Sequence, residues 1–213
     1  RKLAAAREFR PVPGVYVADE DRPENPGQVA FLYPGQGSQR PGMLADLFVA
    51  FPRLQRLLRL DGGRYADAMF PPAAFTPEEA ERQRIALTDT RVAQPALGIA
   101  GLAVHRLLTA LGVRPDLAAG HSHGELVALC AAGVLGEEDL IALSAVRAEA
   151  VLAAAGTADG TVSGDAGAMA VVAARLEEVR TVLTGVGEVV VANHNAPRQV
   201  VISGSSAGID TAL

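Results

Sequence analysis

The segment Gly120–Glu125, which reads GHSHGE, constrains the fold more than any other part of the chain. It places Ser122 between two glycines where a short run, Asp116–Gly120, gives way to a helical pattern, Glu125–Leu135. In the pattern G-x-S-x-G, small residues let a strand and a helix approach closely and leave the serine oxygen exposed at the turn. N–H groups at the helix start can stabilise a developing negative charge. The segment therefore predicts a strand–turn–helix unit with a candidate nucleophile; a turn without chemistry is the alternative.

A second strand and loop come earlier in the chain. Val29–Tyr33 is a continuous apolar run that ends at Pro34 and Gly35, a pattern typical of a strand buried on both faces of a parallel sheet. The loop Gly35–Gln39, which reads GQGSQ, follows directly. Such a loop can bring a backbone N–H toward the Ser122 oxygen, so strand, loop and elbow together predict one site.

Helical patterns dominate the rest of the chain up to Ala155. In the longest of them, Val92–Leu111, apolar residues recur at three- and four-residue spacing, and Gly112 supplies a C-cap. Three acidic residues begin the last pattern and complement its helix dipole. We expect helices over Met43–Phe51, Arg53–Leu60, Pro77–Leu87, Val92–Leu111 and Glu137–Ala155.

The character of the sequence changes after Gly156–Gly167, a stretch rich in Gly, Ser, Thr and Asp that predicts a mobile surface loop and a subdomain boundary. Beyond it we expect a β-α-β-β-α order over Ala168–Ala173, Leu176–Leu183, Glu188–Ala192, Gln199–Ser203 and a helix from Ser205 to Leu213. This order lacks only the last strand of a ferredoxin-like unit. We therefore divide the chain into a proline-rich linker (residues 1–28), a main subdomain (29–160) and a partial subdomain (161–213).

Composition excludes several classes of protein. With 213 residues, 49% hydrophobic and 20% charged, the chain is an ordinary globular sequence. A net charge of −5 with both signs interspersed argues against a nucleic-acid partner. Cys130 is the only cysteine, lies in an apolar run that predicts a buried position, and favours a reducing compartment. No segment has the roughly 20 apolar residues of a membrane span, so we expect a soluble, cytoplasmic protein without a membrane partner or a metal site.

Five motifs occur in a fixed order that matches a known family. They are PGQGSQ at Pro34–Gln39, QPA at Gln94–Ala96, GHSHGE at Gly120–Glu125, an arginine at Arg147, and NHNAPRQVVIS at Asn193–Ser203. Together they resemble the malonyl-CoA:acyl carrier protein transacylases and the acyltransferase domains of polyketide synthases. The resemblance implies an α/β fold: an α/β-hydrolase-like subdomain with a parallel sheet, plus an inserted ferredoxin-like subdomain that is incomplete here.

The resemblance also implies a reaction. Ser122 would take a malonyl-type acyl group from coenzyme A and pass it to the phosphopantetheine thiol of an acyl carrier protein. The coenzyme A thioester is a substrate, no cofactor is bound, and a ketosynthase-type domain would neighbour this one in the same polypeptide. Backbone N–H groups of Gln36 and His123 would form the oxyanion hole. Substrate-binding positions implied by the motifs are Arg147, Gln94, His121 and Asn193.

Arg147 is the most discriminating of these residues. It lies within an otherwise apolar helical pattern, where a buried cation is costly unless an anion pairs with it. A guanidinium binds a carboxylate through a planar fork, which suits the free carboxylate of a malonyl group. The alternative is a solvated arginine on an exposed helix face.

Two features depart from the commonest family pattern. His123 occupies the variable place after the serine, as in iterative synthases of the enediyne and polyunsaturated-acid kind; alternatively its side chain only packs at the pocket wall. The family's general base is a histidine whose place falls beyond Leu213. His121, His123 and His194 are not expected to replace it, because an elbow points adjacent side chains away from the serine oxygen and a base must come within about 3 Å.

Two other functions remain open on the sequence. A serine esterase also has a nucleophile elbow and an oxyanion hole, although Arg147 and the PGQGSQ loop argue against this function. A non-catalytic docking fragment of a megasynthase is compatible with the missing base. The motifs also leave the choice between malonyl and methylmalonyl open.

Overall fold

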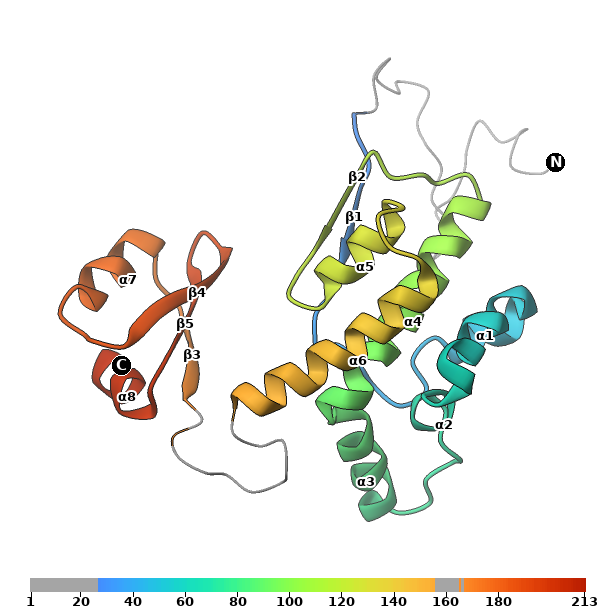
Figure 1. Cartoon of the computed structure of the whole chain (residues 1–213), viewed down its shortest axis with the longest axis horizontal. Helices are drawn as coiled ribbons and strands as arrows, with labels where there is room; N and C mark the ends of the chain where they lie inside the picture. The colour runs from blue at the N-terminus through green and yellow to red at the C-terminus, as the bar shows by residue number, and fades with distance from the viewer. Residues whose placement is uncertain (1–26, 156–164, 166) are drawn as a thin grey trace, which may run out of the picture.

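Figure 1 shows the computed structural model, which describes residues 27–155, 165 and 167–213. Most of the predicted linker (residues 1–28) and most of the predicted loop at Gly156–Gly167 lie outside this part of the chain. The first elements are β1 (Ala30–Tyr33), α1 (Ala45–Ala50), the 3₁₀ helix η1 (Pro52–Gly63), α2 (Ala66–Met69), α3 (Pro77–Thr88), α4 (Thr90–Ala110), β2 (Leu117–Gly120), α5 (Gly124–Ala131) and α6 (Glu137–Ala154). Then follow β3 (Ala168–Val172), α7 (Leu176–Leu183), β4 (Val189–Ala196), β5 (Gln199–Gly204) and α8 (Ser206–Ala212).

Strands β1 and β2 pair in parallel and bring two distant loops together. Their register joins Ala30 to Leu117 and Tyr33 to Gly120. Carboxyl ends of parallel strands lie at the same edge of a sheet, and ligands bind at such edges in open α/β sheets. The loop after Tyr33 and the turn after Gly120 therefore meet at this edge, as the motifs require.

Helix α4 forms the centre of the larger hydrophobic core and packs against α5 and α6. The Asp89 side chain accepts a hydrogen bond from the Arg91 N–H and caps its start. Two glycines in α4 allow close helix contacts: a Cβ at Gly98 would lie 3.2 Å from Ile141 of α6, and one at Gly101 would lie 2.8 Å from Val127 of α5. Small residues in α4 thus bring α5 and α6 near each other.

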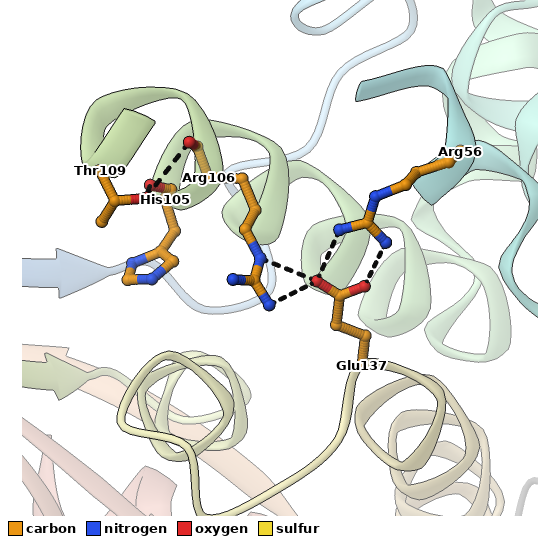
Figure 2. Close-up of polar contacts among 5 residues, drawn as sticks. All are labelled: Arg56, His105, Arg106, Thr109 and Glu137. Carbon is orange, nitrogen blue, oxygen red and sulfur yellow. Dashed lines mark hydrogen bonds and ion pairs between the residues drawn. The ribbon is translucent and has the colours of Figure 1, made fainter. Parts of the chain in front are cut away.

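The start of α6 is fixed by an ion-pair cluster that Figure 2 shows in close-up. Glu137 accepts hydrogen bonds from Arg56 of η1, at 2.6 and 3.0 Å, and from Arg106 of α4, at 2.8 Å. The Glu137 side chain is only 15% exposed. Hydrogen bonding to Arg56, assisted by Arg106, lowers the pKa of this carboxyl below its ordinary value despite the opposing effect of burial. One carboxylate therefore connects three elements at the N-terminus of α6.

The later elements form a smaller unit with a core of its own. Strands β3, β5 and β4 make an antiparallel sheet in that order, with β5 in the centre. Residues of α7 and α8 pack on one face of this sheet, and the core consists of Val179, Val189, Val200, Ile202 and Ile209. On the sheet itself, Met169, Val171 and Val190 are exposed.

One prediction about the first strand is wrong for the part of the chain described. Tyr33 is buried in the core, but Leu32 is 77% exposed and Leu117 on β2 is 54% exposed. Side chains alternate across a strand, and nothing among the described residues covers the side to which Leu32 points. Within the described residues, the strand formed by the apolar run Val29–Tyr33 is therefore covered on one face.

Several predicted boundaries also shift. Helix α5 ends at Ala131 rather than Leu135, because Gly133 takes a left-handed conformation (φ 81°) and its N–H donates to the Cys130 carbonyl. The predicted helix Arg53–Leu60 is a 3₁₀ helix with a kink at Leu60 and Asp61. Strand β4 runs on to Ala196 through two irregularities in its pairing.

Glu137→Gln should lower the free energy of unfolding by about 1 kcal/mol. The change removes the charge that Arg56 and Arg106 share, and both of those side chains are about half exposed, which limits the loss. Urea unfolding at neutral pH measures it. Glu138→Gln is the matched control, because Glu138 lies in the same first turn but is exposed. Equal stability of the two variants would contradict an anchoring role for Glu137.

Candidate active site

Ser122 lies at a strained turn that the surrounding backbone enforces. Its φ is 54°, a left-handed value uncommon for a residue with a side chain. A Cβ at Gly120 would collide with the backbone of Gly124, and a Cβ at Gly124 would collide with the carbonyl group of Tyr33. The strand–turn–helix unit predicted around Ser122 is confirmed, and both glycines are required by the close approach of β1, β2 and α5.

The loop after β1 packs directly against this turn. A Cβ at Gly35 would lie 2.6 Å from the carbonyl oxygen of His121 and 3.2 Å from the Cβ of Ser122. Gln36 follows immediately, and His123 is the N-cap of α5. Within the described residues, neither the Gln36 N–H nor the His123 N–H donates a hydrogen bond to the backbone or to a side chain. Both N–H groups therefore lack a partner among the described residues, which an oxyanion hole requires of its donors.

The Gln36 side chain is clamped to the beginning of α4. Its amide nitrogen donates to the Thr90 hydroxyl at 3.1 Å, and its amide oxygen accepts from Gln94 at 3.4 Å. Gln94 is only 1% exposed, and its own amide oxygen has no hydrogen-bond partner among the described residues. Gln94 thus contacts the Gln36 side chain, and its predicted contact with substrate stays a prediction.

Arg147 reaches the serine from α6. Its Nη2 donates to the Ser122 Oγ at 3.2 Å, and the residue is half-buried. Among the described residues no carboxylate lies within ion-pair distance of Arg147. A guanidinium carries five N–H donors, so further donors remain for an anionic group placed beside the serine. The position differs from that of a solvated arginine on an exposed helix face.

The His123 side chain is fully buried between the elbow and α6. Its Nε2 lies 2.8 Å from the Ser144 Oγ, and that hydroxyl lies 2.7 Å from the Leu140 carbonyl to which it donates. Burial, together with the positive charge of Arg147, lowers the pKa of the imidazole to about 4. Sequence reasoning missed Ser144; its only signal is its place one helical turn before Arg147.

The remaining candidate residues have varied surroundings. His121 is exposed and lies against Gly35. Asn193 is on β4 opposite Val201, and no hydrogen bond between described residues joins its side chain to the elbow. Cys130 is buried, as predicted. His105 is also buried, with its Nδ1 2.9 Å from the Tyr33 hydroxyl.

The described residues contain no cluster of His, Cys, Asp or Glu that could hold a metal ion. None of the helices in the same residues has the length and apolar character needed to cross a membrane. The one hydrogen bond to the Ser122 Oγ in this part of the chain comes from Arg147. The site thus combines a strained serine, free backbone donors and a cation, without a histidine on the serine oxygen.

Comparison with known proteins decides the family. Residues 30–212 match the acyl transferase domain family. The chain belongs to this family. Polyketide synthase GfsA of Streptomyces halstedii is 37% identical over 195 residues, which cover 86% of this chain and 2% of the synthase. The malonyl CoA-acyl carrier protein transacylase of Bacillus subtilis is 35% identical over 186 residues, which cover 87% of this chain and 56% of the transacylase.

A solved structure supports the same relationship. A type II polyketide synthase malonyl-transacylase in complex with its acyl carrier protein matches with a TM-score of 0.71 and 33% identity. The match covers 87% of this chain and 58% of that one. This acyl transferase domain therefore spans little more than half the length of the transacylases that it matches.

Gly124→Ala should destabilise this acyl transferase domain by more than about 2 kcal/mol, because the added methyl group collides with the Tyr33 carbonyl group. Gly185→Ala is the control: a Cβ there meets nothing within 4 Å, and its effect should stay within about 0.5 kcal/mol. Thermal and urea unfolding measure both variants. A fully stable Gly124→Ala variant would contradict the close approach of α5 to β1.

His123 should make stability depend on pH between about 6.5 and 4. The folded state disfavours the imidazole proton, so between these values the unfolded state binds more protons and stability falls as the pH falls. From pH 6.5 to 5 the loss is about 2 kcal/mol. Urea unfolding at both pH values measures this loss. Because His123→Gln has no imidazole to protonate, its free energy of unfolding should decrease by about 2 kcal/mol less over the same pH range. Parallel pH profiles for the two proteins would refute the assignment.

Proposed function

We propose that the protein transfers a malonyl-type acyl group from coenzyme A, through an ester on Ser122, to the phosphopantetheine thiol of an acyl carrier protein. The observation that carries the proposal is the hydrogen bond from the Arg147 guanidinium to the Ser122 Oγ. It puts beside the nucleophile a cation that has no carboxylate partner in the part of the chain that the structure describes. A serine esterase acting on neutral substrates has no need of such a cation.

Each half of the reaction uses the same groups. The Ser122 Oγ attacks the thioester carbonyl, the carbon–sulfur bond breaks, and the coenzyme A thiolate leaves and takes up a proton. During attack the carbonyl oxygen becomes negative and accepts from the N–H groups of Gln36 and His123. Such a donor contributes roughly 3–4 kcal/mol to transition-state stabilisation. The carrier thiol then attacks the ester, and the serine regains its proton.

The proton acceptor for Ser122 is a separate part of the proposal. Among the described histidines, His123 contacts Ser144 through Nε2 and His105 contacts Tyr33. His121 and His194 are exposed and have no hydrogen bond to the serine oxygen. We therefore assign the general base to a group outside the described residues.

Arg147 would hold the substrate carboxylate. A fork of N–H donors matches a carboxylate in two parallel hydrogen bonds, and the guanidinium is already at the reacting oxygen. An acetyl group offers no such partner and leaves the cation half-buried and unpaired. The arrangement therefore favours malonyl-type groups, while His121 and Asn193 stay predicted contacts of the same pocket.

Gln94 has a supporting role in this proposal. It is buried and donates to the amide oxygen of Gln36, while the amide nitrogen of Gln36 donates to the Thr90 hydroxyl. A fixed Gln36 side chain limits rotation of the Gln36 backbone, whose N–H is the proposed oxyanion donor. Gln94 would thus help to hold the oxyanion donor at Gln36, and its contact with the substrate stays a prediction.

The architecture fits the same proposal. The parallel β1–β2 pair and the elbow support an α/β-hydrolase-like subdomain over residues 29–160. The β3-α7-β4-β5-α8 order and the antiparallel sheet support a partial ferredoxin-like subdomain over 161–213. The relatedness to Streptomyces polyketide synthases supports a place beside a ketosynthase-type domain in a larger synthase.

Labelled malonyl-CoA should acylate Ser122, both without and with added imidazole, which can accept the serine proton as an external base. Acid quenching followed by mass spectrometry of the Ser122 peptide measures the adduct, with Ser122→Ala as the blank. Absence of label on Ser122, with imidazole and without it, would overturn the proposed function.

Arg147→Ala should reduce malonyl transfer by roughly a hundredfold or more, because truncating one partner of a desolvated charge pair costs several kcal/mol. Acetyl transfer should change much less. The ratio of the two acylation rates measures the effect. Arg84→Ala, at an exposed arginine paired with Glu81, controls for loss of a positive charge. An unchanged ratio in Arg147→Ala would exclude a carboxylate clamp.

A further inference from the structure

Four residues form a ring at the site, made of two side-chain hydrogen bonds, one peptide link and one turn of α6. Ser122 and His123 are neighbours on the elbow, and the His123 Nε2 lies 2.8 Å from the Ser144 Oγ on α6. Ser144 lies three positions before Arg147, so the two share one face of α6. Arg147 closes the ring by donating to the Ser122 Oγ at 3.2 Å. The imidazole is thus the link between the elbow and the helix that carries the cation.

The hydroxyl of Ser144 fixes the tautomer of His123. A serine hydroxyl has one proton, and Ser144 donates it to the Leu140 carbonyl. Toward the imidazole it can only accept, so the His123 Nε2 carries the proton and donates it. The His123 Nδ1 is then an unprotonated acceptor, and it has no partner among the described residues. The nearby Arg147 charge and full burial both favour this neutral form.

Helix α6 is therefore held at two places along one side. Glu137 ties its first turn to η1 and α4, and Ser144 ties it to the elbow two turns later. Arg147 follows one turn further on. A long arginine side chain has many rotamers, so the position of its helix decides whether the guanidinium reaches the serine oxygen.

We propose that the His123 side chain is a positioning residue: by donating to Ser144 it holds α6 against the elbow and sets the Arg147 guanidinium at the distance from Ser122 that binding of an acyl carboxylate requires. This role is separate from that of the His123 backbone N–H. Its consequence for substrate preference rests on the proposed function, whereas the ring of contacts does not.

The test compares three substitutions in the ring. His123→Gln keeps an amide N–H that can donate to Ser144, His123→Leu removes the donor, and Ser144→Ala removes the acceptor while leaving residue 123 intact. For each, acylation of Ser122 by malonyl-CoA and by acetyl-CoA is followed in imidazole-containing buffer. Phenylmethylsulfonyl fluoride, a neutral reagent without a carboxylate, reports on the serine and the oxyanion donors alone.

In His123→Leu and in Ser144→Ala, the ratio of the malonyl to the acetyl acylation rate should decrease by a factor of roughly ten to a hundred. A shift of the Arg147 guanidinium by about 1 Å can reduce the rate by up to a hundredfold. His123→Gln should retain most of the ratio. In Ser144→Ala, reaction with phenylmethylsulfonyl fluoride should stay close to that of the unmodified protein. An unchanged ratio in Ser144→Ala, or equal losses with all three reagents, would overturn the proposal.

A second readout separates this inference from the proposed function. Nitrogen-15 NMR of the labelled protein should show a neutral His123 with the proton on Nε2, and Ser144→Ala should change its signals. A proton on Nδ1 would overturn the ring even where malonyl transfer is observed. The expected tautomer in a protein that transfers no malonyl group would instead leave the ring intact and refute the proposed function alone. Thermal unfolding identifies any of the three variants that does not fold, and the remaining two variants then test the proposal.

Discussion

The close approach of β1, β2 and α5 is the constraint on which the rest of the site depends. It exists because Gly120 and Gly124 lack side chains where any Cβ would meet backbone atoms. The approach forces Ser122 into a left-handed conformation with φ of 54°. At that turn the Ser122 hydroxyl accepts from Arg147, and the His123 N–H has no partner among the described residues. Strain at the serine is offset by the packing of the core behind it, a common relation at functional sites.

Helix α6 carries two charged residues that matter for this turn, Glu137 at its start and Arg147 beside the serine. At one end of α6, Glu137 accepts from two arginines and holds the helix start. Further along, Arg147 stands beside the serine without a carboxylate partner among the described residues. A cation left in that state is costly unless a ligand anion completes it. Helix α6 therefore carries Glu137, which is paired with two arginines, and Arg147, which has no carboxylate partner among the described residues and is the proposed place of the substrate carboxylate.

Much of this arrangement follows from local sequence. The G-x-S-x-G spacing predicts the elbow, and helical periodicity predicts α4 and α6 to within about two residues. Each of the two strands is followed by a Gly-rich segment, and the carboxyl ends of parallel strands lie at the same edge of the sheet. Gln36 is therefore predicted to lie near the elbow. Each of these signals is local, or depends on a pairing rule that holds in most α/β folds.

The sequence does not predict features that depend on which neighbours surround a side chain. An apolar run looks the same whether one face or both faces are covered, so the exposure of Leu32 escapes prediction. Gln94 matches a family motif, yet only packing shows that it lies behind Gln36. Ser144 has no motif at all, and its contact with His123 depends on how α6 crosses the elbow.

The most direct test of the central claim is a crystal structure of the protein carrying a malonyl ester on Ser122. We expect both oxygens of the malonyl carboxylate within hydrogen-bond distance of the Arg147 guanidinium. The ester carbonyl oxygen should accept from the Gln36 and His123 N–H groups. A carboxylate that points into solvent, with Arg147 turned away from it, would contradict the account.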